Sequence, residues 1–271
     1  MVTPWFNALD KMTFDKSKCN LLIYDNAQGL DLKNALLKNI EQRQNEFKSV
    51  RYYKSHRRGG RTILGQDNNN WNRSKLKPIW FMWVHITKMI KDEVFVQIED
   101  DTIAPPKAVQ ELLNNLISLK KAAFVTAIET GRNLFITTKV RLGVHYIKRE
   151  GNKIIERMSL SPDTKGIVEI DSAGVYCFAA FLKDWKKAFI DYQKYVKEVP
   201  FFAMDNLLTH NIKLNGGLLY ANFGHWCDHM QATGGILYPF NKKNAVQMAD
   251  LWIPQFNNYA QAIEIKKEKK K

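Results

Sequence analysis

Short apolar runs rich in β-branched and aromatic residues alternate along the chain with segments that carry apolar residues at helical spacing. Such runs are typical of buried strands. They occupy residues 21–24, 50–53, 94–98, 122–127, 167–178 and 218–221, where the run 167–178 contains a glycine break. Because strands that alternate with helices tend to pair in parallel, the pattern predicts an α/β fold. We expect a mixed, mostly parallel sheet flanked by helices, in a single domain.

The segments between these runs carry the signals of helix starts and ends. Helices are expected over residues 4–12, 30–47, 71–89, 107–117 and 205–214. Proline is favoured in a first helical turn, and the residues before 107 are Pro105-Pro106. Gly216 and Gly217 are suited to end the last helix. The segments at 144–149 and 153–157 flank Glu150-Gly151-Asn152, which predicts a β-hairpin.

The chain carries a strong positive charge. Its net charge is +14, from 41 Lys and Arg residues against 27 Asp and Glu. This balance favours polyanionic partners, which include nucleic acid, an anionic membrane surface and phosphorylated substrates, but it does not choose among them. The basic residues are dense over 43–77, where Arg57, Arg58 and Arg61 lie in an expected loop around Gly59-Gly60. Arginine suits phosphate, so this loop would contact a diphosphate or a polyanionic acceptor, and a solvated loop is the alternative.

Cysteine use and hydropathy indicate a compartment. The three cysteines, Cys19, Cys177 and Cys227, show no paired spacing, so a disulfide framework is not expected and a reducing compartment is. No window approaches about 18 uninterrupted apolar residues, the length that a membrane-spanning helix needs. We therefore expect a cytoplasmic protein with neither a transmembrane helix nor a signal peptide. The basic segment 43–77 would allow peripheral contact with a membrane surface.

Three carboxylates follow the apolar run at 94–98. Glu99, Asp100 and Asp101 come directly after this strand and before the helix that Pro105-Pro106 introduces. Ligands commonly bind at the carboxyl ends of strands in α/β sheets. Adjacent carboxylates repel one another unless a positive charge lies among them, and their oxygen atoms suit a hard divalent cation. The alternative is a solvated acidic turn, and the flanking strand and prolines favour the metal.

The run Ile98-Glu99-Asp100-Asp101-Thr102, with Pro105-Pro106, resembles the Asp-X-Asp element of GT-A-type glycosyltransferases of the family-2 kind. Those enzymes bind a nucleotide-sugar through a metal ion on its diphosphate. The resemblance therefore implies a Rossmann-like fold, a nucleotide-diphosphate-sugar donor and Mn²⁺ or Mg²⁺. Glu99 stands in the first acidic place, and Asp100 would orient or bind the donor.

A second part of the resemblance lies near the end of the chain. An acid at a helix start, a Gly-Gly stop, a strand and then Cys-Asp-His recur in inverting enzymes of this type. Asp205 matches their general base, although the usual Glu-Asp pair is Met204-Asp205 here. His229 matches the histidine that completes the metal site, with Glu99 and Asp101. The implied reaction moves a sugar to an acceptor hydroxyl with inversion, the acceptor being a glycan, a lipid, a protein or modified DNA.

The nucleotide end of the site rests on fewer residues. Asp25, with Asn26 beside it, matches the acidic position after the second strand that commonly contacts the nucleotide, and Arg73 would approach the nucleotide-sugar. Residues 4–7 are similar to the nucleotide loop after the first strand of the family, a strand reduced here to Val2-Thr3. An ordinary Asx turn is the alternative for Asp25 and Asn26. Asp171 is a second-tier candidate at the sugar and acceptor cleft, with a solvated strand end as its alternative.

The resemblance divides the chain into two halves of one domain. Residues 1–120 would bind the nucleotide-sugar and end in the acidic motif and its helix, and residues 121–262 would bind the acceptor and carry the base. Residues 263–271 read as a basic, disordered tail.

Other functions stay open from sequence. The charge favours a nucleic-acid-binding module, although no helix-turn-helix, zinc finger or paired aromatic RNA-binding signature is visible. A glycosyltransferase that acts on modified DNA would combine both features. A metal-dependent nucleotidyltransferase would use the acids but leave Asp205 and His229 without a role. His225, Cys227 and His229 have spacing suited to zinc, but no second ligand cluster accompanies them.

Overall fold

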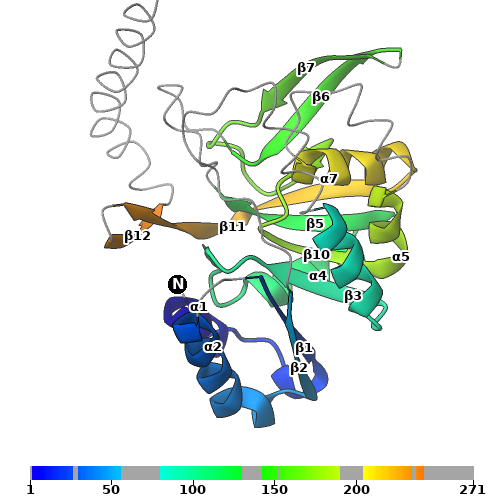
Figure 1. Ribbon diagram of the computed structural model, residues 1–271. Helices are drawn as coiled ribbons and strands as arrows, with labels where there is room; N and C mark the ends of the chain where they lie inside the picture. Colours follow the sequence, from blue (N-terminus) through cyan, green and yellow to red (C-terminus); the bar gives the residue numbers. More distant parts are fainter. Residues whose placement is uncertain are drawn as a thin grey trace, which may run out of the picture.

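A mixed sheet runs through the centre of the molecule (Figure 1). The structure is a computed structural model, and it describes residues 2–26, 30–55, 80–129, 142–151, 153–189, 204–233 and 236–240. The strand order of this sheet is β12-β11-β5-β10-β3, and β4 and β8 each pair with β11. Its strands are β3 (Val94–Ile98), β4 (Thr102–Ile103), β5 (Ala122–Glu129), β8 (Ile167–Ile170), β10 (Cys177–Phe181), β11 (Leu218–Thr233) and β12 (Ile236–Phe240).

The strand directions bring three carboxyl ends to one edge. β11 is parallel to β5, whereas β10 is antiparallel both to β5 and to β3. β3, β5 and β11 therefore point the same way, and the segment that follows β3 lies at the same edge as the end of β5. The prediction of a mostly parallel sheet needs correction here, because among the described strands only β5–β11 and β1–β2 are parallel pairs.

The segment that leads into β10 changes its pairing partner along its length. The predicted strand over 167–178 divides into β8, β9 (Ser172–Ala173) and β10, and the chain bends between them. β8 pairs with β11, β9 pairs with β6 and β10 pairs with β5 and β3, so the three pieces have different partners, although β8 and β10 run in the same sense. Periodicity alone shows an apolar run and cannot show that the chain changes partner within it.

A helix-strand unit precedes the central sheet and lies below it in Figure 1. Its elements are α1 (Val2–Asp10), η1 (Lys16–Lys18), β1 (Asn20–Asp25), α2 (Leu30–Arg43), η2 (Gln44–Glu46) and β2 (Ser49–Lys54). β1 and β2 pair in parallel, as the alternation of strand and helix predicts. The Arg43 guanidinium on α2 holds both Asp10 carboxylate oxygens on α1, at 2.6 and 2.7 Å.

The first helix is confirmed, and it corrects one part of the resemblance. Residues 4–7 lie within α1 rather than in a nucleotide loop after a strand. Phe6 is 1% exposed and belongs to the buried cluster beneath the central sheet. The apolar face that suggested a helix is therefore used for packing.

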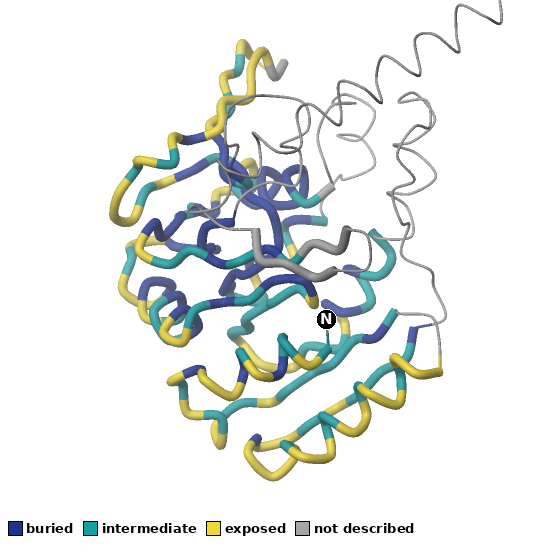
Figure 2. The backbone as a smooth tube through the Cα atoms, turned by 90° about the vertical axis from the view of Figure 1, so that its left-hand side faces the viewer, coloured by how far each residue is buried: buried dark blue, intermediate teal, exposed yellow. Residues whose placement is uncertain are grey.

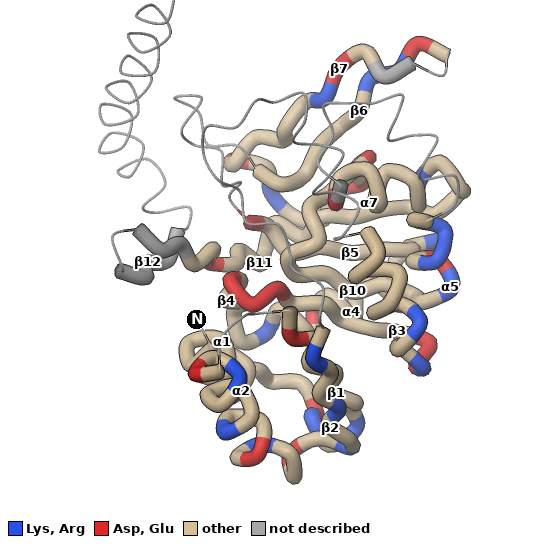
Figure 3. Tube along the Cα trace, in the orientation of Figure 1, with Lys and Arg blue, Asp and Glu red and all other residues tan. Residues whose placement is uncertain are grey.

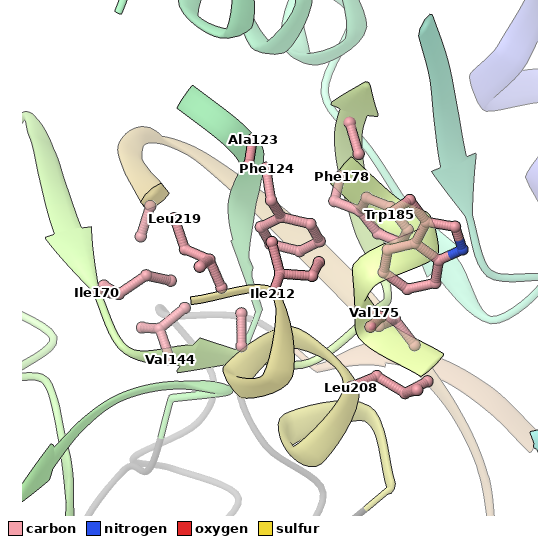
Figure 4. Packing of buried hydrophobic residues seen from close by; sticks show 14 of the residues in the cluster. Ala123, Phe124, Val144, Ile170, Val175, Phe178, Trp185, Leu208, Ile212 and Leu219 are labelled. Carbon is pink, nitrogen blue, oxygen red and sulfur yellow. The ribbon is translucent and has the colours of Figure 1, made fainter. Parts of the chain in front are cut away.

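Two apolar clusters cover the two faces of the central sheet. Phe124 and Phe178 point into the first cluster, and their neighbours Val125 and Cys177 point into the second, as alternation along a strand requires. Figure 4 shows the first cluster, in which the rings of Phe124 and Phe178 stack with centroids 4.6 Å apart and Trp185 lies beside them. Figure 2 shows buried positions concentrated around this sheet and exposed positions along α2.

Helices complete both layers. α4 (Ala108–Ser118) packs on β5 and β10 through its buried face, and α7 (Met204–Leu214) packs on β9 and β11. α5 (Leu182–Trp185) and η4 (Lys186–Phe189) follow β10 and carry Trp185 into the core. Residues 80–89 are helical, in agreement with the end of the predicted helix at 71–89, whose start lies outside the described residues.

The predicted hairpin is confirmed. β6 (Val144–Glu150) and β7 (Lys153–Ser159) pair antiparallel around Gly151, whose φ of 57° is one that glycine adopts readily. The hairpin projects from the rest of the molecule (Figure 1). Within the described residues, no helix is long and apolar enough to cross a membrane. Residues 56–79, which hold most of the basic segment, and the tail at 263–271 lie outside the described residues.

Candidate active site

The acidic segment after β3 is held by backbone hydrogen bonds at the sheet edge. The Glu99 N–H donates to the carbonyl of Tyr176 at 2.8 Å, and the Thr102 N–H donates back to the carbonyl of Glu99 at 3.1 Å. The next residues form β4, which pairs with β11 so that Thr102 faces His229. Figure 3 shows this segment as a red stretch beside β4, between the N-terminal unit and the central sheet.

Asp101 and His229 meet at this edge. Asp101 Oδ2 lies 3.3 Å from His229 Nε2, although 128 residues separate the two in sequence. The carbonyl of Asp101 also accepts the Met230 N–H at 2.7 Å, so backbone pairing fixes the approach. Asp101 is 9% exposed and His229 is 3% exposed. Of the predicted metal ligands, these two are brought together.

The other two acids of the segment have different surroundings. Glu99 is half-buried, and Asp100 is exposed. Across the part of the chain that the structure describes, no set of three or more His, Cys, Asp or Glu side chains is gathered as a metal site. The structure therefore does not bring Glu99 into a common ligand cluster with Asp101 and His229.

Glu129 is a site residue that was not predicted from sequence. It ends β5, is 4% exposed, and places Oε2 3.6 Å from His229 Nδ1. Its Oε1 accepts a hydrogen bond from the Thr102 hydroxyl at 2.9 Å. The signal was present in the sequence, because Glu129 is an acid at the end of an apolar strand, as Glu99 is. The predicted strand ended at residue 127, so Glu129 was not assigned to it.

The zinc alternative gains no support from the described residues. Cys227 lies at the end of the β5–β11 pairing, and a hydrogen bond with Cys177, together with burial, raises the pKa of its thiol well above the ordinary value. Zinc binds the thiolate, which a raised pKa disfavours. His225 and His229 do not form a cluster with Cys227 that could hold a metal.

Asp205 lies in the first turn of α7, as predicted. Its Oδ1 accepts the Asn206 backbone N–H at 2.8 Å and the Asn206 side-chain amide at 3.2 Å. Burial raises the pKa of the Asp205 carboxyl, and the hydrogen bonds from Asn206 offset part of this rise. A carboxylate whose pKa is raised accepts a proton more readily than an ordinary aspartate does.

A glycine makes room between Asp205 and the sheet. A Cβ atom at Gly174 would lie 2.6 Å from the Tyr176 ring and 3.3 Å from Asp205 Oδ2. Tyr176 is buried, and burial followed by repulsion from the Glu129 charge raises the pKa of its hydroxyl well above the ordinary value. The glycine break seen in sequence therefore borders the residues of the candidate site.

Asp25 is the last residue of β1, and its side chain contacts residues of β2. Its Oδ2 accepts hydrogen bonds from the Tyr52 hydroxyl at 2.8 Å and from Lys54 Nζ at 2.9 Å. Burial, and then the Asp25 contact, raise the pKa of Tyr52 to about 12. Asn26 donates to the Met82 sulfur at 3.4 Å. Arg73, the remaining residue predicted at the nucleotide, lies outside the described residues.

Asp171 is used within the fold. Its Oδ1 pairs with Lys213 on α7 at 2.6 Å, and its Oδ2 accepts the Ile147 N–H on β6 at 2.8 Å. These contacts tie the hairpin to α7, so its carboxylate is neither a solvated strand end nor one that the structure groups with Asp101 and His229.

Comparison with known proteins gives a result at the level of the fold. No family model matches the chain, and no curated protein matches its sequence. The crystal structure of GalNAc-T7 with UDP, GalNAc and Mn²⁺ aligns at a TM-score of 0.53 and 12% identity, over 84% of this chain and 40% of that chain. The crystal structure of S. aureus TarS aligns at a TM-score of 0.49 and 13% identity, over 83% of this chain and 34% of that chain.

The chain spans less than half the length of either neighbour. At such low identity, the similarity to GalNAc-T7 concerns the arrangement of strands and helices alone. The central sheet, its two helical layers and this alignment together identify the fold. The chain has a GT-A-type glycosyltransferase fold.

Proposed function

We propose that this protein is a metal-dependent glycosyltransferase that moves a sugar from a nucleotide-diphosphate-sugar to an acceptor hydroxyl, with inversion at the anomeric carbon. The observation that carries the proposal is the meeting of Asp101 and His229, 3.3 Å apart at the edge of the sheet. Two side chains that can bind a metal come from distant parts of the chain and are buried together on a GT-A-type fold. This arrangement supports a metal-binding role more than a solvated acidic turn.

The two side chains fit a divalent cation chemically. In an octahedral site with bonds of about 2.1 Å, neighbouring donor atoms lie about 3 Å apart. The 3.3 Å between Asp101 Oδ2 and His229 Nε2 is close to that spacing. Such cations are often held by one or two protein side chains, and substrate phosphates and water complete the shell. A two-residue site therefore suits a donor that brings its own diphosphate.

The two protein ligands favour one metal. Imidazole beside a carboxylate suits manganese better than magnesium, which prefers oxygen ligands. The neighbouring GalNAc-T7 structure was solved with Mn²⁺ and UDP, which supports the same choice. When bound, the cation would offset the negative charge that develops on the leaving diphosphate. Asp100, which borders Asp101, and Glu99 would help to orient the donor beside this two-residue site.

Asp205 would act as the general base. Its raised pKa suits a group that takes the proton from an acceptor hydroxyl during attack. Direct attack from the face opposite the diphosphate inverts the anomeric carbon and needs no covalent intermediate. The acceptor oxygen forms a bond to the anomeric carbon, and its proton goes to Asp205. The sugar–phosphate bond breaks, and its electron pair leaves with the diphosphate.

The end of the β1–β2 pair would hold the nucleotide. Tyr24 and Tyr53 stack at 5.1 Å, and the His85 ring lies edge-on to both, next to Asp25 and Asn26. Aromatic faces and hydrogen-bonding groups at the carboxyl ends of parallel strands suit a nucleotide. Lys54 already balances the Asp25 charge, so we expect Asp25 to contribute through hydrogen bonds rather than as a free anion.

The test is ligand-dependent stability. Thermal unfolding is measured with UDP, GDP, CDP and dTDP, each with and without Mn²⁺. One diphosphate should stabilise the protein only when Mn²⁺ is present, by about 2.7 kcal/mol at a ligand concentration one hundred times Kd. The variant Asp101→Asn should lose this Mn²⁺-dependent stabilisation and also sugar transfer. Asp184→Asn removes another buried carboxylate, on α5, whose Oδ1 lies 2.7 Å from Lys187 Nζ. This control should keep both the Mn²⁺-dependent stabilisation and sugar transfer.

Two results would count against the proposal. Stabilisation of Asp101→Asn equal to that of the wild type would remove Asp101 from the metal site. If no diphosphate stabilises the wild type and DNA binds with a steep dependence on salt, the basic nucleic-acid-binding alternative would be favoured instead.

A further inference from the structure

The β6–β7 hairpin has one face toward the protein and one toward solvent. Along β6, three alternate residues, His145, Ile147 and Arg149, are buried or half-buried, and the residues between 145 and 149 are exposed. Ile147 packs against the first apolar cluster, and Arg149 Nη1 lies 3.4 Å from His210 Nε2 on α7. Because successive residues of a strand point to opposite faces, the inward face of the hairpin is the one turned toward α7.

Arg157 on β7 belongs to this inward face. It is the register partner of Ile147, and residues that oppose each other on paired strands point to the same side of the sheet. Arg157 is nevertheless exposed, because β7 is the outer strand of the three-stranded sheet β7-β6-β9. An arginine in this position contacts solvent while its charge is directed toward α7.

The start of α7 holds Asp205, the proposed base. Burial raises the pKa of the Asp205 carboxyl, and the hydrogen bonds from Asn206 and then the charge of Arg157 offset part of this rise. β9 ties the inward face to the same turn of α7, since Ser172 is the register partner of His145 and its hydroxyl donates to Asn206 Oδ1 at 3.4 Å. An exposed cation and a buried carboxylate from different elements are therefore held within electrostatic range of each other.

The surroundings of Arg157 differ from those of the other cations on the hairpin. Lys148 faces solvent and is opposed in register by Glu156, which carries the opposite charge, whereas Arg157 is opposed by the apolar Ile147. A guanidinium has five N–H donors, and one carboxylate accepts from two of them in a bidentate pair. An exposed arginine near Asp205 can therefore act on that carboxylate and bind an incoming anion at the same time.

This position matters for an acceptor that approaches the base. A hydroxyl that gives its proton to Asp205 brings its neighbouring groups within range of Arg157. An anionic group among them would be repelled by the Asp205 carboxylate unless a nearby positive charge offset the repulsion. The planar guanidinium matches the geometry of phosphate and carboxylate, and the net charge of +14 draws anions to the protein.

We infer that Arg157 is a specificity-determining residue, which binds an anionic group, a phosphate or a carboxylate, close to the reacting hydroxyl of the acceptor. The role of this group as part of an acceptor rests on the proposed function. The binding of the anion by Arg157 does not, because it can be measured without a sugar donor.

The first measurement is binding. Glycerol 3-phosphate and glucuronate are the charged probes, and glycerol and glucose are their neutral counterparts. Calorimetric titration gives the affinity of each probe for the protein alone and for the protein with Mn²⁺ and UDP. Arg157→Gln removes the charge, and Arg157→Lys keeps the charge without the planar fork. Lys148→Gln is the matched control, because it removes a positive charge from the outward face of the same hairpin.

The wild type should bind the charged probes more tightly than the neutral ones, and the tighter of the two charged probes identifies the anion as phosphate or carboxylate. Arg157→Gln should bind the charged probes about 10- to 100-fold more weakly, as expected for the loss of hydrogen bonds between charged groups. Arg157→Lys should lie between Arg157→Gln and the wild type, and Lys148→Gln should match the wild type. Melting curves of the three variants check that each is folded.

Transfer kinetics separate this role from an effect of Arg157 on the base alone. Arg157→Gln should raise KM for glycerol 3-phosphate or glucuronate and leave KM for the matching neutral acceptor unchanged. If the variant instead lowers kcat equally for charged and neutral acceptors and leaves every KM unchanged, Arg157 acts only on Asp205 and the inference is overturned.

The binding data give two further outcomes that would overturn it. One is equal affinity of the wild type for charged and neutral probes, and the other is an equal loss of affinity in Arg157→Gln and Lys148→Gln. If no diphosphate stabilises the protein with Mn²⁺ but anion binding depends on Arg157, the proposed transferase function fails and the anion site stands. If the wild type transfers sugar and Arg157→Gln uses charged and neutral acceptors as the wild type does, the transferase function stands and the inference fails.

Discussion

The carboxylates around the sheet edge have similar intrinsic chemistry and very different surroundings. Asp100 is exposed, Asp101 is buried against His229, and Asp205 has a pKa raised by burial. A buried carboxylate near a positive or metal-binding partner is suited to stay charged, whereas one with a raised pKa is suited to exchange a proton. Burial is common to both side chains, so their partners, His229 for Asp101 and the Asn206 amides for Asp205, favour the proposed binding role for the first and the proposed proton-accepting role for the second.

Replacement of Asp205 by asparagine should reduce transfer and raise stability at the same time. Loss of a general base typically lowers the rate by about 10²- to 10⁴-fold. Because burial raises the folded-state pKa above the unfolded value, the folded state binds the proton more tightly. Stability is then lost as pH rises from near the ordinary aspartate pKa of 3.8 through the raised value. Asp205→Asn lacks this loss, so its melting temperature at neutral pH should be equal to or above that of the wild type.

Initial rates and melting curves from pH 3 to pH 8 measure both effects, and the difference in stability between the two proteins should grow with pH over the lower part of that range. The rate of the wild type should also fall on the acid side at a pH above the ordinary aspartate value. Wild-type turnover by folded Asp205→Asn would remove Asp205 from the role of base.

Elements that rest on one periodic segment could be predicted from sequence. The helix at residues 4–12, the strands at 21–24 and 94–98 and the hairpin around Gly151 all appear, because their apolar positions and turn residues are local signals. The reversal of β10 and the division of 167–178 could not be predicted, because they depend on which strands the pieces pair with. The glycine break was visible, but its reason, the Tyr176 ring, is a tertiary contact.

Substitution of Gly174 by alanine should disturb the element that borders Asp205. The added Cβ would lie 2.6 Å from the Tyr176 ring, which must move, and overpacking of this kind lowers the free energy of unfolding by about 1–3 kcal/mol. Transfer should fall as well, because Asp205 Oδ2 lies 3.3 Å from the same position. Denaturant unfolding and initial rates measure the two effects.

A double-mutant cycle provides the control for Gly174. In a Tyr176→Ala background the ring is gone, so Gly174→Ala should destabilise less than it does in the wild type. An equal change in unfolding free energy in both backgrounds would show that the Tyr176 ring is not what Gly174 accommodates.

At the scale of the whole molecule, the site exists because the chain returns to one edge of the sheet. The acidic segment and His229 could each be selected from sequence, since one follows an apolar strand and the other fits a recurring motif. Their meeting depends on the pairing of β4 with β11, which no local pattern contains. Glu129 was missed for the same reason, because an acid at a strand end becomes informative only when its neighbours in space are known.

The two predicted halves of the chain form one unit, because residues of both halves pack in each apolar cluster. The first cluster contains Trp83 and Ile86 from residues 1–120 among residues of the second half, and the second cluster contains Tyr176, Cys177 and Cys227 among residues of the first. Neither half therefore has an apolar core that is its own. We expect residues 1–120 and 121–262 to unfold together.

Two leucines, one in each cluster, test this cooperativity. Leu112 on α4 and Leu208 on α7 are both fully buried, on opposite faces of the sheet and in different halves of the chain. Leu112→Ala and Leu208→Ala should each lower the free energy of unfolding by about 2–5 kcal/mol, because each leaves a cavity in a packed cluster. In each variant, urea unfolding followed by circular dichroism and by tryptophan fluorescence should show one transition that shifts by the same amount with both probes. A variant that splits the curve, so that one probe reports an early transition and the other keeps the wild-type midpoint, would mean that the halves fold as separate domains. The site of Asp101 and His229 would then lie at a boundary between domains, and its geometry would depend on how the two domains dock.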